Sequence, residues 1–171
     1  MAPVEGQVRN EELDAEREAR RRLALAQIRQ YPDPVLRMKA KPVEDFDEEL
    51  RRLIERMSGL MIEANGVGLA ATQVGILRRL FVFSRGEEDE VIAVVNPEIV
   101  RRSDETETDD EGCLSLQGVA IPVERALSVR LEGVDERGEQ VAYDLEGFPA
   151  RTAQHELDHL DGVLILDRTT L

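Results

Sequence analysis

The sequence contains few of the residues that cross-link proteins or stack on nucleic acids. A single cysteine among 171 residues rules out a disulfide within the chain, which is typical of a reducing compartment. Tryptophan is absent and aromatic residues make up only 4%, which disfavours stacking platforms for single-stranded nucleic acid. No apolar run is long enough to span a bilayer, and the acid-rich N-terminus resembles neither a signal peptide nor a transit peptide. We therefore expect a cytoplasmic protein that makes no contact with a membrane.

The charge is strongly one-sided. Asp and Glu number 36 against 22 Lys and Arg, and the formal net charge is −14. Such a surface repels nucleic-acid phosphates, so we expect no direct reading of nucleic acid. The length and the hydrophobic content of 42% fit one globular domain.

The chain divides into an extension and one domain. Residues 1–27 form a charged N-terminal extension, helical or partly disordered, and residues 28–171 form the domain. Apolar residues recur at three- and four-residue steps over 47–64, which predicts a helix that ends at Gly66 and Gly68. Strands are predicted at 80–84, 91–96, 127–133 and 140–145, and a last helix follows Pro149. The uneven alternation indicates an α+β fold rather than a repeating βαβ unit.

The last predicted helix carries a potential metal site. His155 and His159 are four residues apart, so a helix places both imidazoles on one face. Glu156 adjoins the first of them, which gives the His-Glu-x-x-His pattern of two metal ligands and a general base. The alternative is a helix with two incidental histidines.

The third ligand is expected upstream. A metzincin site would need a third histidine at position 165, where the chain has Ile165. A metalloprotease with a downstream glutamate ligand is also excluded, because no glutamate follows His159. Cys113, the single cysteine, is then the natural candidate, because thiolates bind the same ions as imidazoles. The alternatives are a buried structural cysteine and a nucleophilic cysteine paired with a histidine.

Residues 66–73 (GVGLAATQ) form a third segment of interest. The spacing of the glycines does not match a dinucleotide-binding loop, because Ala71 stands where the third glycine belongs. Small residues before Gln73 indicate tight packing with one amide directed into a cleft, where it can donate to an oxyanion. The alternative is a loop turn with a surface glutamine.

Together, residues 66–73, 111–115 (EGCLS) and 154–159 (QHELDH) resemble the motifs of peptide deformylase, in the same order. The resemblance implies an α+β fold with mixed or antiparallel sheets packed around a central metal-binding helix. It implies removal of the N-formyl group from the N-terminal formylmethionine of newly made proteins, with release of formate.

The resemblance also implies roles for individual residues. Cys113, His155 and His159 would bind one divalent metal and Glu156 would accept a proton from water, while the Gln73 amide and the Leu114 backbone N–H would stabilise the oxyanion. The residues expected to contact the substrate are Val67, Gly68, Gly112 and Phe148.

The expected ion is Fe²⁺, for which Ni²⁺, Co²⁺ or Zn²⁺ can substitute. The expected partners are nascent formyl-methionyl polypeptides and the ribosome, and we expect a monomer. We expect no contact through the longer C-terminal helix with which some members bind the ribosome, and the arginines within residues 17–22 are the alternative contact. Gln117 and Ala120 depart from the proline and arginine that many members have there.

Two other functions remain as alternatives. A general zinc peptidase shares the His-Glu-x-x-His pattern and would cleave internal peptide bonds. A binding module that has lost catalysis would be expected to lack the base or the oxyanion donor, yet Glu156 and Gln73 are both present.

Overall fold

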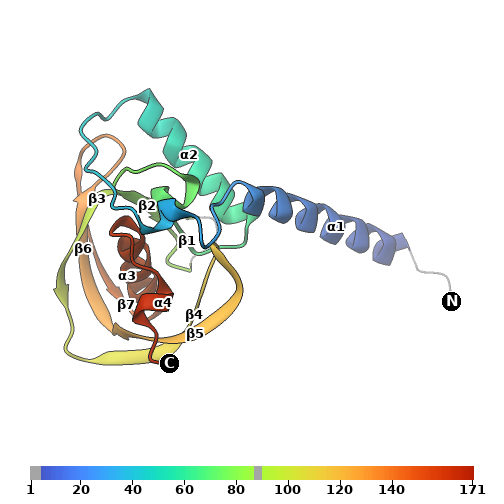
Figure 1. Cartoon of the computed structure of the whole chain (residues 1–171). Helices are drawn as coiled ribbons and strands as arrows, with labels where there is room; N and C mark the ends of the chain where they lie inside the picture. The colour runs from blue at the N-terminus through green and yellow to red at the C-terminus, as the bar shows by residue number, and fades with distance from the viewer. Residues whose placement is uncertain (1–4, 87–89) are drawn as a thin grey trace.

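The computed structural model describes residues 5–86 and 90–171 (Figure 1). Helices, 3-10 turns and strands follow one another in this order: α1 (Glu5–Ala26), η1 (Pro34–Arg37), α2 (Glu48–Glu63), β1 (Gly68–Ala70), η2 (Ala71–Val74), β2 (Leu80–Phe83), β3 (Ile92–Arg102), β4 (Thr106–Cys113), β5 (Leu116–Ala126), β6 (Ser128–Val134), β7 (Gln140–Glu146), α3 (Phe148–Leu160) and α4 (Ile165–Arg168). No helix among these residues is both long enough and apolar enough to cross a membrane.

The strands form two antiparallel sheets. A five-stranded sheet has the order β1-β2-β3-β6-β7, and β4 and β5 form a two-stranded ribbon. α3 lies between them and contacts β1, β2 and β7 of the sheet and β5 of the ribbon (Figure 1). The predicted α+β class, with antiparallel sheets packed around the histidine-bearing helix, is confirmed.

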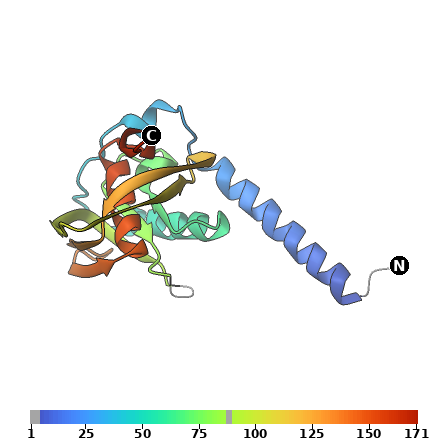
Figure 2. The same ribbon diagram turned by 90° about the horizontal axis from the view of Figure 1, so that it is seen from below.

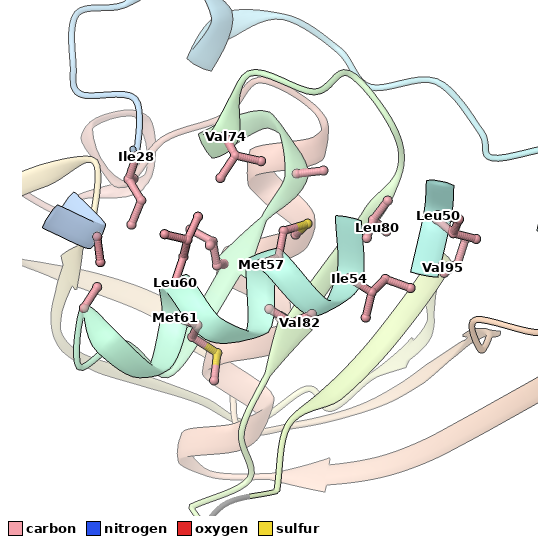
Figure 3. Packing of buried hydrophobic residues seen from close by; sticks show 14 of the residues in the cluster. Ile28, Leu50, Ile54, Met57, Leu60, Met61, Val74, Leu80, Val82 and Val95 are labelled. Atoms are coloured by element: carbon pink, nitrogen blue, oxygen red, sulfur yellow. The ribbon is translucent and has the colours of Figure 1, made fainter. Parts of the chain in front are cut away.

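Both faces of the five-stranded sheet are covered at β2. Leu80 and Val82 of β2 pack in one apolar cluster with α2, whereas Phe81 and Phe83 pack in a second cluster with residues of α3. Figure 3 shows the first cluster, with Met57 and Leu60 of α2 against the sheet. Because both faces are buried, β2 is a continuous apolar run rather than an alternating one.

α2 begins and ends with polar residues that satisfy its backbone. The side chain of Asp47 accepts a hydrogen bond from the backbone N–H of Leu50, as an N-cap residue does. After the C-cap residue Ala64, Asn65 adopts the left-handed conformation with φ of 58°. The prediction that a glycine makes this turn is therefore wrong in detail: asparagine, which also tolerates this region, makes it.

α1 projects away from the rest of the protein (Figures 1 and 2). Only its C-terminal end joins the core among the residues whose burial is described: Ala24 and Leu25 are buried in the cluster formed with α2. Residues 11–20 are all exposed. The placement of a domain boundary after residue 27 stays a prediction, although these two buried side chains precede it.

The ribbon of β4 and β5 was not predicted. Residues 106–110 of β4 are all exposed, so they lack the apolar alternation that marks a half-buried strand. β5 shows only an irregular burial pattern. Pairing along Thr106–Cys113, rather than hydrophobic patterning, makes these residues a strand, and that pairing carries Cys113 to α3.

Candidate metal centre

His155 and His159 project from one face of α3, one helical turn apart. The helix starts after Gly147, which has φ of 69°, and Pro149 occupies the first turn, where its missing N–H breaks no hydrogen bond. The two Nε2 atoms lie 3.2 Å apart. The helical spacing therefore brings both imidazoles to one point, as predicted.

Cys113 reaches the same point from the end of β4. A bulge separates Glu111 from Cys113, which pairs with Leu116 where the chain turns into β5. Its Sγ lies 3.4 Å from His159 Nε2 and accepts the backbone N–H of Ser115 at 3.4 Å. The turn thus directs the thiol toward the histidine pair.

These three side chains fit one divalent ion. Their ligand atoms all lie within 4.8 Å of one another. A tetrahedral ion with metal–nitrogen bonds of about 2.0–2.1 Å and a metal–sulfur bond of about 2.3 Å separates its ligands by about 3.3 Å between nitrogens and about 3.6 Å between sulfur and nitrogen. The observed 3.2 Å and 3.4 Å are close to these separations. Three protein ligands also leave a fourth position open, as in catalytic sites.

Glu111 forms a hydrogen bond with Nδ1 of His155, the ring nitrogen that faces away from the other two ligands. Its Oε1 lies 2.9 Å from His155 Nδ1, and Arg125 donates to its two oxygens at 2.9 and 3.0 Å. Arg151 donates to Oε2 at 2.6 Å. Because an ionised carboxylate only accepts hydrogen bonds, Nδ1 must carry the proton, and Nε2 is the atom directed toward the other ligands.

Glu111 is ionised although it is buried. Burial alone would raise its pKa, but hydrogen bonds from His155 and Arg125 outweigh this effect and lower the pKa of Glu111 to about 2. Arg125 also donates to Asp158 on α3 at 2.6 Å, and Arg168 of α4 donates to the same carboxylate. The network therefore ties β4, β5, α3 and α4 together beneath the metal ligands.

Glu156 presents a carboxylate beside the ligands. The residue is 3% exposed, and its Oε1 has no hydrogen-bond partner among the described residues. Burial raises the pKa of Glu156 to about 7. A Cβ at Gly68 would lie 2.5 Å from Oε2, so the carboxylate occupies this place only because position 68 is a glycine. A carboxyl group that titrates near neutral pH suits proton transfer.

Hydrogen bonds to the oxygen and to the nitrogen of its side-chain amide fix the orientation of Gln73. Oε1 accepts the backbone N–H of Ala70 at 2.9 Å, and Nε2 donates to Ser115 Oγ at 3.0 Å. Nε2 also lies 3.7 Å from Cys113 Sγ. The residue is 1% exposed, so the alternative of a surface glutamine is wrong. Its NH₂ group faces the metal ligands.

A cleft of about 500 Å³ opens beside these groups. Phe148 and Val67, 57% and 43% exposed, leave apolar surface along it, and Gln117 and Ala120 line it too. The structure also brings to this cleft the remaining residues expected at the substrate and oxyanion: Gly68, Gly112, Leu114 and Gln73.

Sequence patterns assign no role to Arg151 or Asp158, which the structure places in the network around Glu111 and Arg125. Gln154, predicted only as part of a motif, attaches α3 to β5 by hydrogen bonds in both directions with the backbone of Ala126. The sequence signal that could have indicated these roles is the presence of charged residues beside the predicted ligands. Their partners depend on the ribbon, which sequence patterns did not predict.

Comparisons with known proteins find one family throughout. The family profile described as polypeptide deformylase matches residues 25–171. The chain is 52% identical over 141 residues to the peptide deformylase of Thermotoga neapolitana, covering 82% of this chain and 85% of that protein. It is 46% identical over 148 residues to the peptide deformylase of Desulforudis audaxviator, covering 86% and 96%. The crystal structure of Thermotoga maritima peptide deformylase superposes with a TM-score of 0.81 at 49% identity, covering 84% of this chain and 97% of that one.

Proposed function

The chain belongs to the peptide deformylase family, and from this we propose that Cys113, His155 and His159 hold the metal while Glu156 moves the proton. Members of the family are metal-dependent hydrolases that remove the N-formyl group from nascent peptides, and this protein is such an enzyme. The observation that supports the residue roles best is the convergence of a thiol and two imidazoles next to a buried, unpartnered carboxylate.

The metal supplies Lewis acidity when bound, which makes a water molecule more acidic and polarises the formyl carbonyl. Oε1 of Glu156 has no hydrogen-bond partner among the described residues, so it is free to accept a proton from water. Burial raises the pKa of Glu156 to about 7, which lets the same carboxyl group return the proton to the leaving amine. A bound cation would lower this pKa and favour the basic form.

Two donors would stabilise negative charge on the formyl oxygen. The NH₂ group of Gln73 is held toward the ligands by Ser115 and by the backbone of Ala70. The second donor is the backbone N–H of Leu114, which lies between Cys113 and Ser115 at the turn that lines the cleft. Removing one such donor typically costs about 10²–10³ in kcat.

The substrate would lie along the apolar part of the cleft. Val67, Gly68 and Gly112 present backbone at which a peptide can approach closely, and glycine at two of the three positions removes steric hindrance. Phe148 offers an exposed aromatic face to the thioether side chain of methionine, a favourable contact for sulfur.

We further propose Fe²⁺ as the native ion, with Ni²⁺, Co²⁺ and Zn²⁺ as substitutes, because a thiolate and two imidazoles accept all of these metals. The proposed setting is the cytoplasm, where a monomer meets formyl-methionyl chains as they leave the ribosome. Arg17, Arg20 and Arg22 are exposed on the projecting α1 and offer charge to ribosomal phosphates.

The test is formate release from a formyl-methionyl tripeptide by anaerobically purified, iron-loaded protein. The matched control is the same tripeptide with an acetyl group in place of formyl. We expect rapid formate release and no acetate. Cleavage of an internal peptide bond would favour the zinc peptidase instead. Absence of both reactions, with one metal bound per chain, would favour a binding module.

A further inference from the structure

α1 contributes two residues to the active-site cleft, Arg21 and Leu25. They are four positions apart, so they lie on the same face of the helix. The family profile begins at residue 25, so Arg21 precedes the part of the chain that it matches. One wall of this cleft thus includes a side chain from the charged N-terminal segment.

The C-terminal end of α1 and the residues directly after it are attached to the core beside the metal centre. Leu25 is buried in the cluster that α2 forms with β1 and β2. Directly after the helix, the backbone N–H of Arg29 donates to the carbonyl of Gln73 at 2.7 Å, and that of Tyr31 donates to the carbonyl of Ser115 at 2.8 Å. A short, hydrogen-bonded path therefore sets the position of the helix relative to the reacting groups.

Arg21 differs from its neighbours on the helix. Its side chain is 38% accessible and the residue is half-buried, whereas Arg20 and Arg22 on either side of it are exposed. Its ion-pair partner is Glu18 at 3.4 Å, which also pairs with Arg22 and is itself 46% accessible. Such an exposed, shared pair contributes little. The guanidinium is therefore available to a ligand in the cleft.

The other charges along the cleft are mostly engaged. Five charged or titratable lining residues belong to the metal centre or to the network beneath it: Glu111, Cys113, Arg151, His155 and Glu156. Asp110 on β4 is exposed and carries the opposite charge to Arg21. The cleft is therefore not basic as a whole, and a preference for an anion must come from Arg21 itself.

The positions of the lining residues, from the metal ligands outward, determine which part of a substrate can reach Arg21. Leu114 adjoins the ligand Cys113 and packs on the cluster that contains Leu25, and Arg21 follows one helical turn farther out. A peptide with its formyl group at the metal centre would reach this guanidinium only with residues beyond the formylmethionine.

We propose that Arg21 is a specificity-determining residue that binds an acidic side chain in the peptide segment following formylmethionine. The inference rests on the deformylase function and concerns the outer end of the same cleft. The planar guanidinium matches a carboxylate with two parallel hydrogen bonds, a geometry that neither an amide nor an ammonium group reproduces.

The experiment measures formate release by the full-length, iron-loaded protein from C-terminally amidated formyl-Met-Ala-Ala-Ala. Single Glu, Gln or Lys residues replace each alanine in turn, and the amide removes the terminal carboxylate as a competing anion. We expect Glu to exceed Gln in kcat/KM by about threefold at one position, through KM rather than kcat. Arg21→Ala should abolish this preference, and Arg21→Glu should shift it toward Lys.

Arg20→Ala is the matched control, because Arg20 is exposed on the same helix and does not line the cleft. It should keep the preference for Glu. An equal loss in Arg20→Ala, or an unchanged Glu preference in Arg21→Ala, would overturn the proposal, as would equal rates for Glu and Gln in the unmodified protein. The all-alanine peptide separates the two claims: the unmodified protein and Arg20→Ala should both turn it over, and no formate from it at all would contradict the deformylase function instead.

Discussion

Nδ1 of His155 lies 2.9 Å from Oε1 of Glu111, a residue only two positions before the ligand Cys113. One short segment of β4 therefore supplies a metal ligand and also orients a second ligand on α3. The carboxylate fixes the proton on Nδ1 and makes Nε2 the more basic donor to a metal. Binding of the metal and packing of the ribbon against α3 are thus coupled through Glu111.

We expect Glu111→Gln to weaken metal binding about 10- to 100-fold, because an amide is a poorer acceptor for His155 and removes the negative charge that faces Arg125 and Arg151. Competition with a chelator measures the affinity. The control is Glu107→Gln, which changes an exposed side chain on the same strand. Equal affinities for the two variants would contradict the role of Glu111.

Acid should destabilise the metal-free protein through Glu111. Its pKa is lowered from 4.5 to about 2 in the folded state, so the ionised form stabilises the fold at every pH above 4.5. That contribution, about 3 kcal/mol, is lost as the pH falls from 4.5 toward 2. Urea unfolding at pH 5 and pH 3 measures the loss. Glu111→Gln should flatten the pH dependence, and an equally steep dependence in this variant would argue against the assignment.

Substitutions of Glu156 and of Cys113 should reduce the activity in different ways. Glu156→Gln removes the base but none of the ligands, so we expect a normal metal content with kcat lower by about 10²–10⁴. Cys113→Ala removes a ligand and should lose the metal itself. Metal analysis beside formate release distinguishes them. Normal turnover by Glu156→Gln would refute the proposed proton transfer.

Gly68→Ala should displace the base without touching a ligand. The added Cβ would lie 2.5 Å from Glu156 Oε2, and a misplacement of about 1 Å can lower a rate about 100-fold. We expect the metal content to be normal and kcat to fall by this amount. Gly59→Ala is the control, since nothing lies within 4 Å of a Cβ there. It should keep full activity and stabilise α2 by about 0.5–1 kcal/mol. Full activity of Gly68→Ala would contradict the close approach.

The elements with strong local patterns were predictable. α2 has a continuous apolar face, β2 is an apolar run, and Pro149 marks the start of α3. β4 was not predictable, because residues 106–110 are exposed and polar and become a strand only by pairing with β5. The same reason hid the partners of Glu111, since Arg125 lies on β5 and Arg151 on α3.

The sequence by itself determined the features that depend on neighbouring residues. Helical geometry alone directs His155 and His159 to one side, and the chain holds a single cysteine that could join them. Only the tertiary structure decided which segments meet: Cys113 at the histidines, Glu111 behind one of them, Gly68 against Glu156, and Arg21 at the mouth of the cleft. These contacts join segments far apart in the chain, and their distances follow from strand register and helix packing, which no local pattern encodes.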